Sequence, residues 1–303
     1  ENAVKFYQDV IDECKKNDII LVLNLHHFDL PIELFQKYGG WESKHVVDLY
    51  AKFAKTAFEL FGDQVHYWTT FNEPMVIPEA GYLCGFHYPK YVNKGKEAMQ
   101  VIYNLNLASA KAIALCHEIC DAKIGNILNL TPAYPATDSK EDQETSKIVD
   151  AFYNRSFLEP AVHGVFPQEM IDIMKENDVL WDQNEEELEI IKNNTIDFLG
   201  VNYYHPKRVK TRTTPLDCDY WSPEQYYEEY DMPGKRVNPY RGWESIQKQS
   251  MTLPKMYKKI TTIFHGLSLK MVWVWKAKNA ISMKKVRSKM IIELISMKNI
   301  YSY

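Results

Sequence analysis

The stretch Val65–Pro74 (VHYWTTFNEP) is the feature that most constrains the fold of this chain. β-Branched and aromatic residues run without interruption to Phe71, which predicts a buried strand, and the run then stops at Asn72. Pro74 has no backbone N–H, so the strand cannot continue its hydrogen-bond ladder beyond it. Glu73 therefore ends a buried strand, where burial disfavours the ionised carboxylate and suits a proton donor.

Three further segments predict buried strands, Ile19–Phe28, Ala122–Leu130 and Ile196–Tyr204. Segments of helical period separate the strands, at 1–17, 43–61, 97–120, 140–157 and 167–177, and a loop is predicted over Met75–Lys94. Strands that alternate with helices predict a parallel sheet with right-handed crossovers. Polar residues end all four strands, as in a (β/α)8 barrel with its active site at that face. An open doubly wound sheet stays an alternative, although no Gly-rich phosphate loop follows any of these strands.

Composition narrows the classes of function. A net charge of −4 over 303 residues does not indicate a nucleic-acid-binding protein. No stretch predicts a signal peptide or a membrane span, and the start at Glu1 suggests a processed or incomplete chain. Five cysteines without framework spacing favour a reduced cytoplasm. Cys116 and Cys120 lack a second ligand pair, so we expect no metal and no cofactor.

Four segments resemble glycoside hydrolase family 1: LHHFDLP (25–31), WTTFNEP (68–74), IGNILNLTPAYP (124–135) and DFLGVNYY (197–204). TFNEP is a highly specific motif, and the others follow in the right order and spacing. The resemblance covers residues 1–244 and implies an incomplete TIM (β/α)8 barrel, an α/β fold in which strands three to six are recognisable. Within the family, residues 197–210 and 230–244 look most like bacterial 6-phospho-β-glucosidases, which act inside the cell on sugars phosphorylated during uptake.

The resemblance also implies the roles of individual residues. Glu73 corresponds to the general acid/base, and Asn72 to the residue that hydrogen-bonds the sugar 2-hydroxyl. His27 corresponds to a ligand of another sugar hydroxyl. Asn202 and Tyr204 lie where the family orients its nucleophilic carboxylate. Alone, Glu73 could be a charge at a helix N-terminus and His27 a satisfied core histidine; their occurrence together favours the functional interpretation.

The nucleophile itself is absent from the sequence. A retaining mechanism uses two carboxyl groups roughly 5 Å apart, and the family supplies the second from a seventh-strand motif resembling I-[ST]-E-N-G. Residues 245–303 contain no such motif; they hold twelve Lys or Arg and one acid, Glu293. We therefore expect residues 1–244 to form a partial family 1 barrel. We expect residues 245–303 to be a basic, Met-rich tail outside the native fold.

The implied function is a retaining β-glycosidase of the cytoplasm that hydrolyses 6-phospho-β-glucosides. The implied partner is a small-molecule β-glucoside that is 6-phosphorylated. We expect no binding to nucleic acid or to a membrane. Without a nucleophile we expect this chain to be inactive, and four of eight strands should leave apolar sheet edges open and make it poorly soluble. A β-glucosidase or β-galactosidase for unphosphorylated sugars, and a non-catalytic sugar-binding pseudoenzyme, stay open. A basic tail that anchors nucleic acid or membrane is disfavoured because its charges follow no amphipathic period.

A shifted reading frame after Glu244 would explain the tail. Read displaced by two bases, the codons for Phe264–Val274 permit WFISENGMG, the expected nucleophile strand. We expect the displaced frame of the encoding DNA to specify Glu-Asn-Gly across the Leu269–Lys270 codons. Sequencing the locus measures this directly. A displaced frame that encodes any other three residues at this point would rule out the frameshift.

Overall fold

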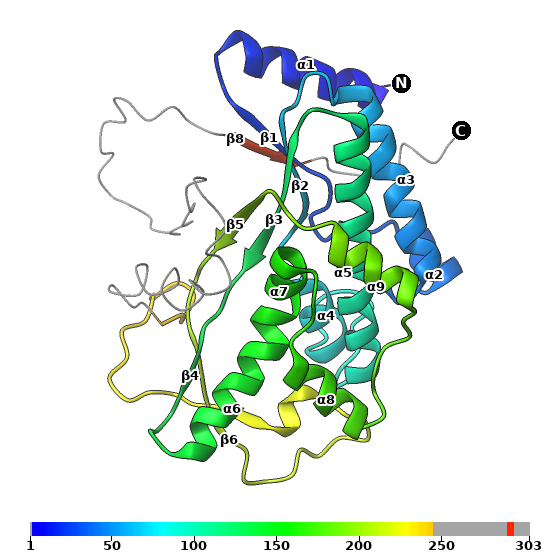
Figure 1. Ribbon diagram of the computed structural model, residues 1–303. Coiled ribbons are helices and arrows are strands. Elements are labelled where there is room, and N and C mark those ends of the chain that lie inside the picture. The colour runs from blue at the N-terminus through cyan, green and yellow to red at the C-terminus, as the bar shows by residue number, and fades with distance from the viewer. Residues whose placement is uncertain (1, 245–289, 294–303) are drawn as a thin grey trace.

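The computed structural model describes residues 2–244 and 290–293 (Figure 1). Its α-helices are α1 (Asn2–Lys16), α2 (Ile32–Tyr38), α3 (Lys44–Phe61), α4 (Val76–Pro78), α5 (Gly95–Ile119), α6 (Lys140–Asp150), α7 (Ser156–His163), α8 (Gln168–Glu176) and α9 (Glu185–Asn193). Short 3₁₀ or π turns are η1 (Gly40–Glu42), η2 (Glu79–Leu83), η3 (Ala151–Arg155) and η4 (Pro223–Gln225). The strands are β1 (Leu21–Asn24), β2 (Tyr67–Asn72), β3 (Lys123–Asn129), β4 (Ala133–Pro135), β5 (Phe198–Asn202), β6 (Lys207–Thr211), β7 (Tyr227–Glu229) and β8 (Met290–Glu293).

The main sheet has the strand order β5-β3-β2-β1-β8, and every pair in it is parallel. The four predicted strands are therefore confirmed as β1, β2, β3 and β5, each followed or preceded by helices, as the barrel interpretation requires. Helices α3 and α5 lie side by side along the sheet (Figure 1). Residues 101–110 of α5 are buried on every side, so this helix is a core element rather than a surface one. In the part of the chain that the structure describes, no helix combines the length and apolarity needed to cross a membrane.

A smaller sheet, β4-β6-β7, follows the carboxyl ends of β3 and β5. β4 pairs with β6 in parallel and β6 with β7 in antiparallel orientation. The prediction of a plain loop over Met75–Lys94 is wrong in its first half, where α4 and η2 form. Backbone hydrogen bonds from Val76 to Glu73 O (3.0 Å) and from Glu79 to Met75 O (3.1 Å) wind this segment into helical turns. The chain thus leaves β2 in hydrogen-bonded helical turns rather than in an open loop.

Most of the predicted tail, residues 245–303, lies outside the described residues. Its four described residues form β8, which pairs with β1 in the register Leu21↔Met290 to Asn24↔Glu293. This pairing places β8 at one edge of the main sheet, with β5 at the other. The domain boundary at Glu244 and the frameshift stay predictions.

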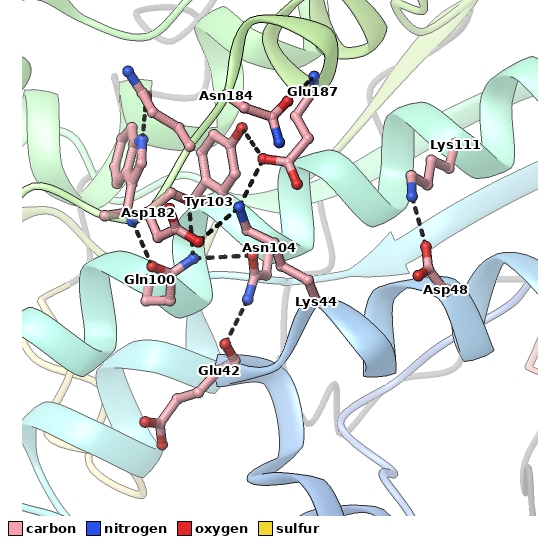
Figure 2. Close-up of polar contacts among 12 residues, drawn as sticks. Glu42, Lys44, Asp48, Gln100, Tyr103, Asn104, Lys111, Asp182, Asn184 and Glu187 are labelled. Atoms are coloured by element: carbon pink, nitrogen blue, oxygen red, sulfur yellow. Dashed lines mark hydrogen bonds and ion pairs between the residues drawn. The ribbon is translucent and has the colours of Figure 1, made fainter.

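Polar contacts join α3, α5 and α9 on the outside of the sheet (Figure 2). Lys44 Nζ lies 2.9 Å from Glu187 Oε2 and 3.0 Å from Asp182 Oδ2. The hydroxyl of Tyr103 donates to the same Glu187 oxygen at 2.9 Å. At the start of α9 the Asn184 side chain accepts from the Glu187 N–H, which caps the helix. These contacts attach the short helix α9, which sequence periodicity missed, to its longer neighbours.

Asn104 is a fully buried polar residue in the middle of α5. Its Nδ2 donates to the carbonyls of Trp41 (2.8 Å) and Glu42 (2.9 Å), the last two residues of η1. Figure 2 shows the contact with Glu42. The carbonyls at the end of a helical turn have no partner within the turn, so this side chain supplies it. Gln100 Nε2 in turn donates to Asn104 Oδ1 at 3.1 Å.

Replacing Asn104 by Ala should destabilise the fold, because two buried carbonyls would lose their donor. We expect the free energy of unfolding, measured in urea, to fall by about 2–3 kcal/mol. The matched control is Asn193→Ala at the exposed end of α9, where we expect a change of about 0.5 kcal/mol or less. Equal losses in the two variants would contradict this role of Asn104.

Asp197 joins β3, β5 and the end of α5. Its Oδ2 accepts from the backbone N–H of Ile124 (2.9 Å) and contacts Nε2 of His117 (2.9 Å). Burial acts to raise the pKa of Asp197, but the Ile124 N–H and His117 outweigh it, so the pKa lies below its ordinary value. The carboxylate of Asp197 is therefore held ionised at the amino-terminal ends of two paired strands.

This pKa predicts a pH dependence of stability. Because the folded pKa of Asp197 is below the unfolded value, the stabilisation is complete above pH of about 4 and is lost as the pH falls through the folded pKa. Asp197→Asn should flatten that acid limb of the stability curve and cost about 1–3 kcal/mol at neutral pH. Denaturation over a pH series measures both effects. Asp9→Asn, at an exposed helix ion pair, is the control, and an equal change of slope in that variant would refute the assignment.

Candidate active site

The end of β2 is shaped by a register shift against β3. Thr69 pairs with Gly125, but Asn72 pairs with Ile127, so β2 has one more residue than β3 over this interval. Such bulges re-aim a side chain at the end of a strand. The Glu73 N–H then donates to Ile127 O at 2.7 Å, and Glu73 adopts a left-handed φ of +50°. A non-glycine residue reaches this region at a cost, which the surrounding contacts of Glu73 offset.

The carboxylate of Glu73 is buried and accepts two hydrogen bonds on one oxygen. Asn202 Nδ2 donates to Glu73 Oε1 at 2.7 Å, and the Tyr204 hydroxyl donates to the same atom at 2.5 Å. Burial and the neighbouring Glu73 carboxylate both raise the pKa of Tyr204, so its phenol keeps its proton at neutral pH. Tyr204 is therefore a donor to Glu73 over the whole physiological range.

The predicted sugar ligands continue this hydrogen-bonded row. Asn202 Nδ2 also donates to Asn72 Oδ1 at 3.1 Å, and Asn72 Nδ2 lies 3.1 Å from His27 Nε2. The row runs His27, Asn72, Asn202, Glu73 and Tyr204, and it brings together every site residue that the sequence predicted. They come from β1, β2 and β5, or from the residues directly after them, because the carboxyl ends of parallel strands meet at one edge of the sheet.

His26 and His27 are adjacent but have different surroundings. His26 is buried among the rings of Trp41 and Phe71, each with a centroid 5.3 Å away. Burial, and to a smaller extent His27, lowers the pKa of His26 to about 3, so it is a neutral core residue. The left-handed backbone at Phe28 (φ +67°) then turns the chain away from β1. Of the two histidines, only His27 joins the polar row.

The structure adds aromatic neighbours that sequence reasoning missed. His87, in the segment after η2, lies 5.8 Å from the ring of Phe28. The ring of Trp243 packs on those of Tyr204 and His205, with centroid distances of 5.4 Å and 5.1 Å. The sequence offered only the predicted loop over 75–94 and the family resemblance of residues 230–244, and neither shows which ring meets which.

Asn202 and Tyr204 contact a different carboxylate from the one that the resemblance implied. They correspond to residues that orient the nucleophile, but here both donate to Glu73. Within residues 2–244 and 290–293, no second carboxylate hydrogen-bonds either side chain. The two donors therefore converge on one oxygen of Glu73.

The residues that the structure describes form neither a metal site nor a disulfide. Over the described ranges, no group of three or more His, Cys, Asp or Glu side chains is arranged to hold a metal ion. All five cysteines fall inside residues 2–244, and all are free thiols. Burial, followed by the neighbouring Cys120, raises the pKa of Cys116, which keeps this thiol protonated.

Two curated relatives are similar to this chain in sequence. The 6-phospho-beta-glucosidase GmuD of Bacillus subtilis is 49% identical over 250 residues, which make up 82% of this chain and 53% of that protein. A 6-phospho-beta-galactosidase of Clostridium acetobutylicum is 38% identical over 209 residues, which make up 67% of this chain and 44% of that protein. The chain thus spans about half the length of the curated relatives it matches.

Solved structures share the fold. The family 1 β-glucosidase from Thermotoga maritima superposes with a TM-score of 0.74 at 29% identity, over 84% of this chain and 54% of that one. The virulence factor SghA from Agrobacterium tumefaciens superposes with a TM-score of 0.76 at 26% identity, over 84% and 55%. SghA has also been solved in complex with its substrate analog salicin. The sequence model described as glycosyl hydrolase family 1 matches residues 1–277, and this chain belongs to that family.

Proposed function

We propose that this chain carries the acid/base half of a retaining β-glycosidase site for 6-phospho-β-glucosides. One observation carries the proposal: the buried carboxylate of Glu73 ends β2 inside a hydrogen-bonded row with Asn202, Tyr204, Asn72 and His27. A carboxyl group in such a place can deliver a proton to a leaving group and later remove one from water.

Each member of the row has a proposed task. Glu73 protonates the glycosidic oxygen as its bond to the anomeric carbon breaks, and it takes a proton from the water that follows. Asn72 and His27 bind sugar hydroxyls, and the amide of Asn72 is placed beside Glu73 to strengthen its contact in the transition state. Tyr204 and Asn202 hold the Glu73 carboxylate in one orientation.

The nucleophilic step lacks its group among the described residues. Formation of a glycosyl-enzyme needs a second carboxylate roughly 5 Å from the first. Within residues 2–244 and 290–293, the side chains of Asn202 and Tyr204 hydrogen-bond to no carboxylate other than that of Glu73. We therefore propose that the 303-residue chain hydrolyses its substrate weakly or not at all.

The phosphorylated substrate class rests on the relatives. Two curated relatives that carry phospho-glycosidase names are 49% and 38% identical to this chain. Phosphorylated sugars occur inside the cell, and the five free thiols suit that compartment, so we propose a cytoplasmic location. Assays of an intact relative with phosphorylated and free aryl β-glycosides separate this substrate class from β-glucosidase or β-galactosidase activity.

A non-catalytic sugar-binding protein is the second candidate, because the sugar-facing pair of His27 and Asn72 is intact without the nucleophile. Calorimetric titration with phenyl 6-phospho-β-glucoside tests whether the chain binds a sugar. A binding protein must show saturable heat that Asn72→Ala weakens, whereas a chain with neither function shows no heat of binding.

The role of Glu73 can be tested by supplying a nucleophile from outside. Azide can attack the anomeric carbon while the phenolic oxygen leaves and takes the proton of Glu73. We expect azide to raise phenol release from a phenyl 6-phospho-β-glucoside, and Glu73→Gln to lower that rate by about 10²–10⁴-fold. Absorbance of the released phenol measures it.

Glu33→Gln, an exposed acid on α2, is the matched control and should keep the azide-dependent rate. An unchanged rate in Glu73→Gln would exclude Glu73 as the acid. Turnover without azide that Glu73→Gln abolishes would instead contradict the proposed inactivity of the chain.

A further inference from the structure

Lys207, the first residue of β6, places a positive charge inside the molecule. Its side chain is 11% exposed. Its Nζ lies 3.9 Å from the centroid of the Tyr153 ring, 5.5 Å from that of Tyr227 and 3.4 Å from the Tyr227 hydroxyl. Tyr227 donates its own hydroxyl to Tyr153 at 2.9 Å, which fixes the two rings around the cation.

The counter-ion of Lys207 is Glu79, the first residue of η2, at 3.3 Å between Nζ and Oε1. Burial acts to lower the pKa of Lys207, but Glu79 and the neighbouring Tyr227 and Glu229 raise it above its ordinary value. Lys207 is therefore charged at neutral pH. A buried cation that lost Glu79 would lose the neutralising partner that makes its burial tolerable.

Glu79 lies close in sequence to Glu73, and Lys207 lies close in sequence to Tyr204, whose hydroxyl donates to Glu73. Glu79 follows Glu73 through helical turns in which Glu73 O accepts from Val76 and Met75 O from Glu79. Lys207 follows Tyr204 by three residues, and its own N–H donates to Pro132 O at 3.0 Å, at the start of the β4–β6 pairing. Both connections are short, so each charged residue lies only a few positions along the chain from a member of the polar row.

We propose that the part-buried Glu79–Lys207 ion pair sets the distance between the segment that carries Glu73 and the segment that carries Tyr204. Glu79 and Lys207 are thus positioning residues that hold the Tyr204 hydroxyl on the Glu73 carboxylate. The geometry stands without turnover, and only its consequence for catalysis rests on the proposed function.

The experiment reads the Tyr204–Glu73 hydrogen bond directly by NMR of the 303-residue chain. A phenol held at 2.5 Å from a carboxylate gives a slowly exchanging, downfield hydroxyl resonance, which Tyr204→Phe assigns by removing it. We expect Lys207→Met and Glu79→Gln each to abolish this resonance, and Lys207→Arg, which keeps the charge, to restore it at least in part. Each spectrum is recorded well below the unfolding temperature of that variant.

Lys210→Met is the matched control, because Lys210 lies on the same strand but pairs at the surface with Glu228 at 2.9 Å. In this variant the hydroxyl resonance of Tyr204 should have the same position and intensity as in the unmodified chain. If Lys207→Met does not fold, Glu79→Gln decides, since it leaves Lys207 packed against Tyr153. Persistence of the resonance in folded Glu79→Gln or Lys207→Met, or its loss in Lys210→Met, would overturn the proposal. The NMR signal does not depend on turnover. The role of the ion pair can therefore be disproved without disproving the proposed function, and the reverse also holds.

Discussion

Parallel pairing of β1, β2, β3 and β5 places the carboxyl ends of four buried strands along one edge of the sheet. Each strand is too apolar to end in solvent, and each ends in polar residues. These polar residues therefore meet in a partly buried space where they must satisfy one another, since buried polar groups without partners are costly. The row from His27 to Tyr204 is the result.

The same requirement explains how the surrounding segments are arranged. Glu73 can stand buried and left-handed because its backbone bonds to Ile127 and its carboxylate accepts from Asn202 and Tyr204. The segments that leave these strands form helical turns or a second sheet, and the part-buried charge pair of Lys207 and Glu79 connects them. Contacts outside the row thus support the residues that form it.

Elements with strong periodicity were predictable, and short or polar ones were not. The helices at 1–17, 43–61 and 97–120 correspond closely to α1, α3 and α5, because a long apolar stripe at helical spacing has few other solutions. β6 (KRVKT) has no such signal: it forms because β4 and β7 supply its hydrogen-bond partners. The helical turns after Glu73 were missed because Gly and Pro in the 75–94 segment resemble a loop, although Pro78 follows the first helical positions without breaking them.

Sequence alone determined the family, the alternation of strands and helices, and the five residues that gather at the strand ends, because these are local patterns read along one chain. Tertiary structure alone decided which group each of them contacts. Asn202 and Tyr204 are 129 and 131 residues from Glu73, and nothing local records that both donate to one of its oxygens. The pairing of Lys207 with Glu79 was likewise not predictable, since a lysine in a polar strand predicts exposure, whereas in the fold the rings of Tyr153 and Tyr227 lie against its ammonium group. Residue types set what each side chain can donate or accept; the fold set the distances over which it does so.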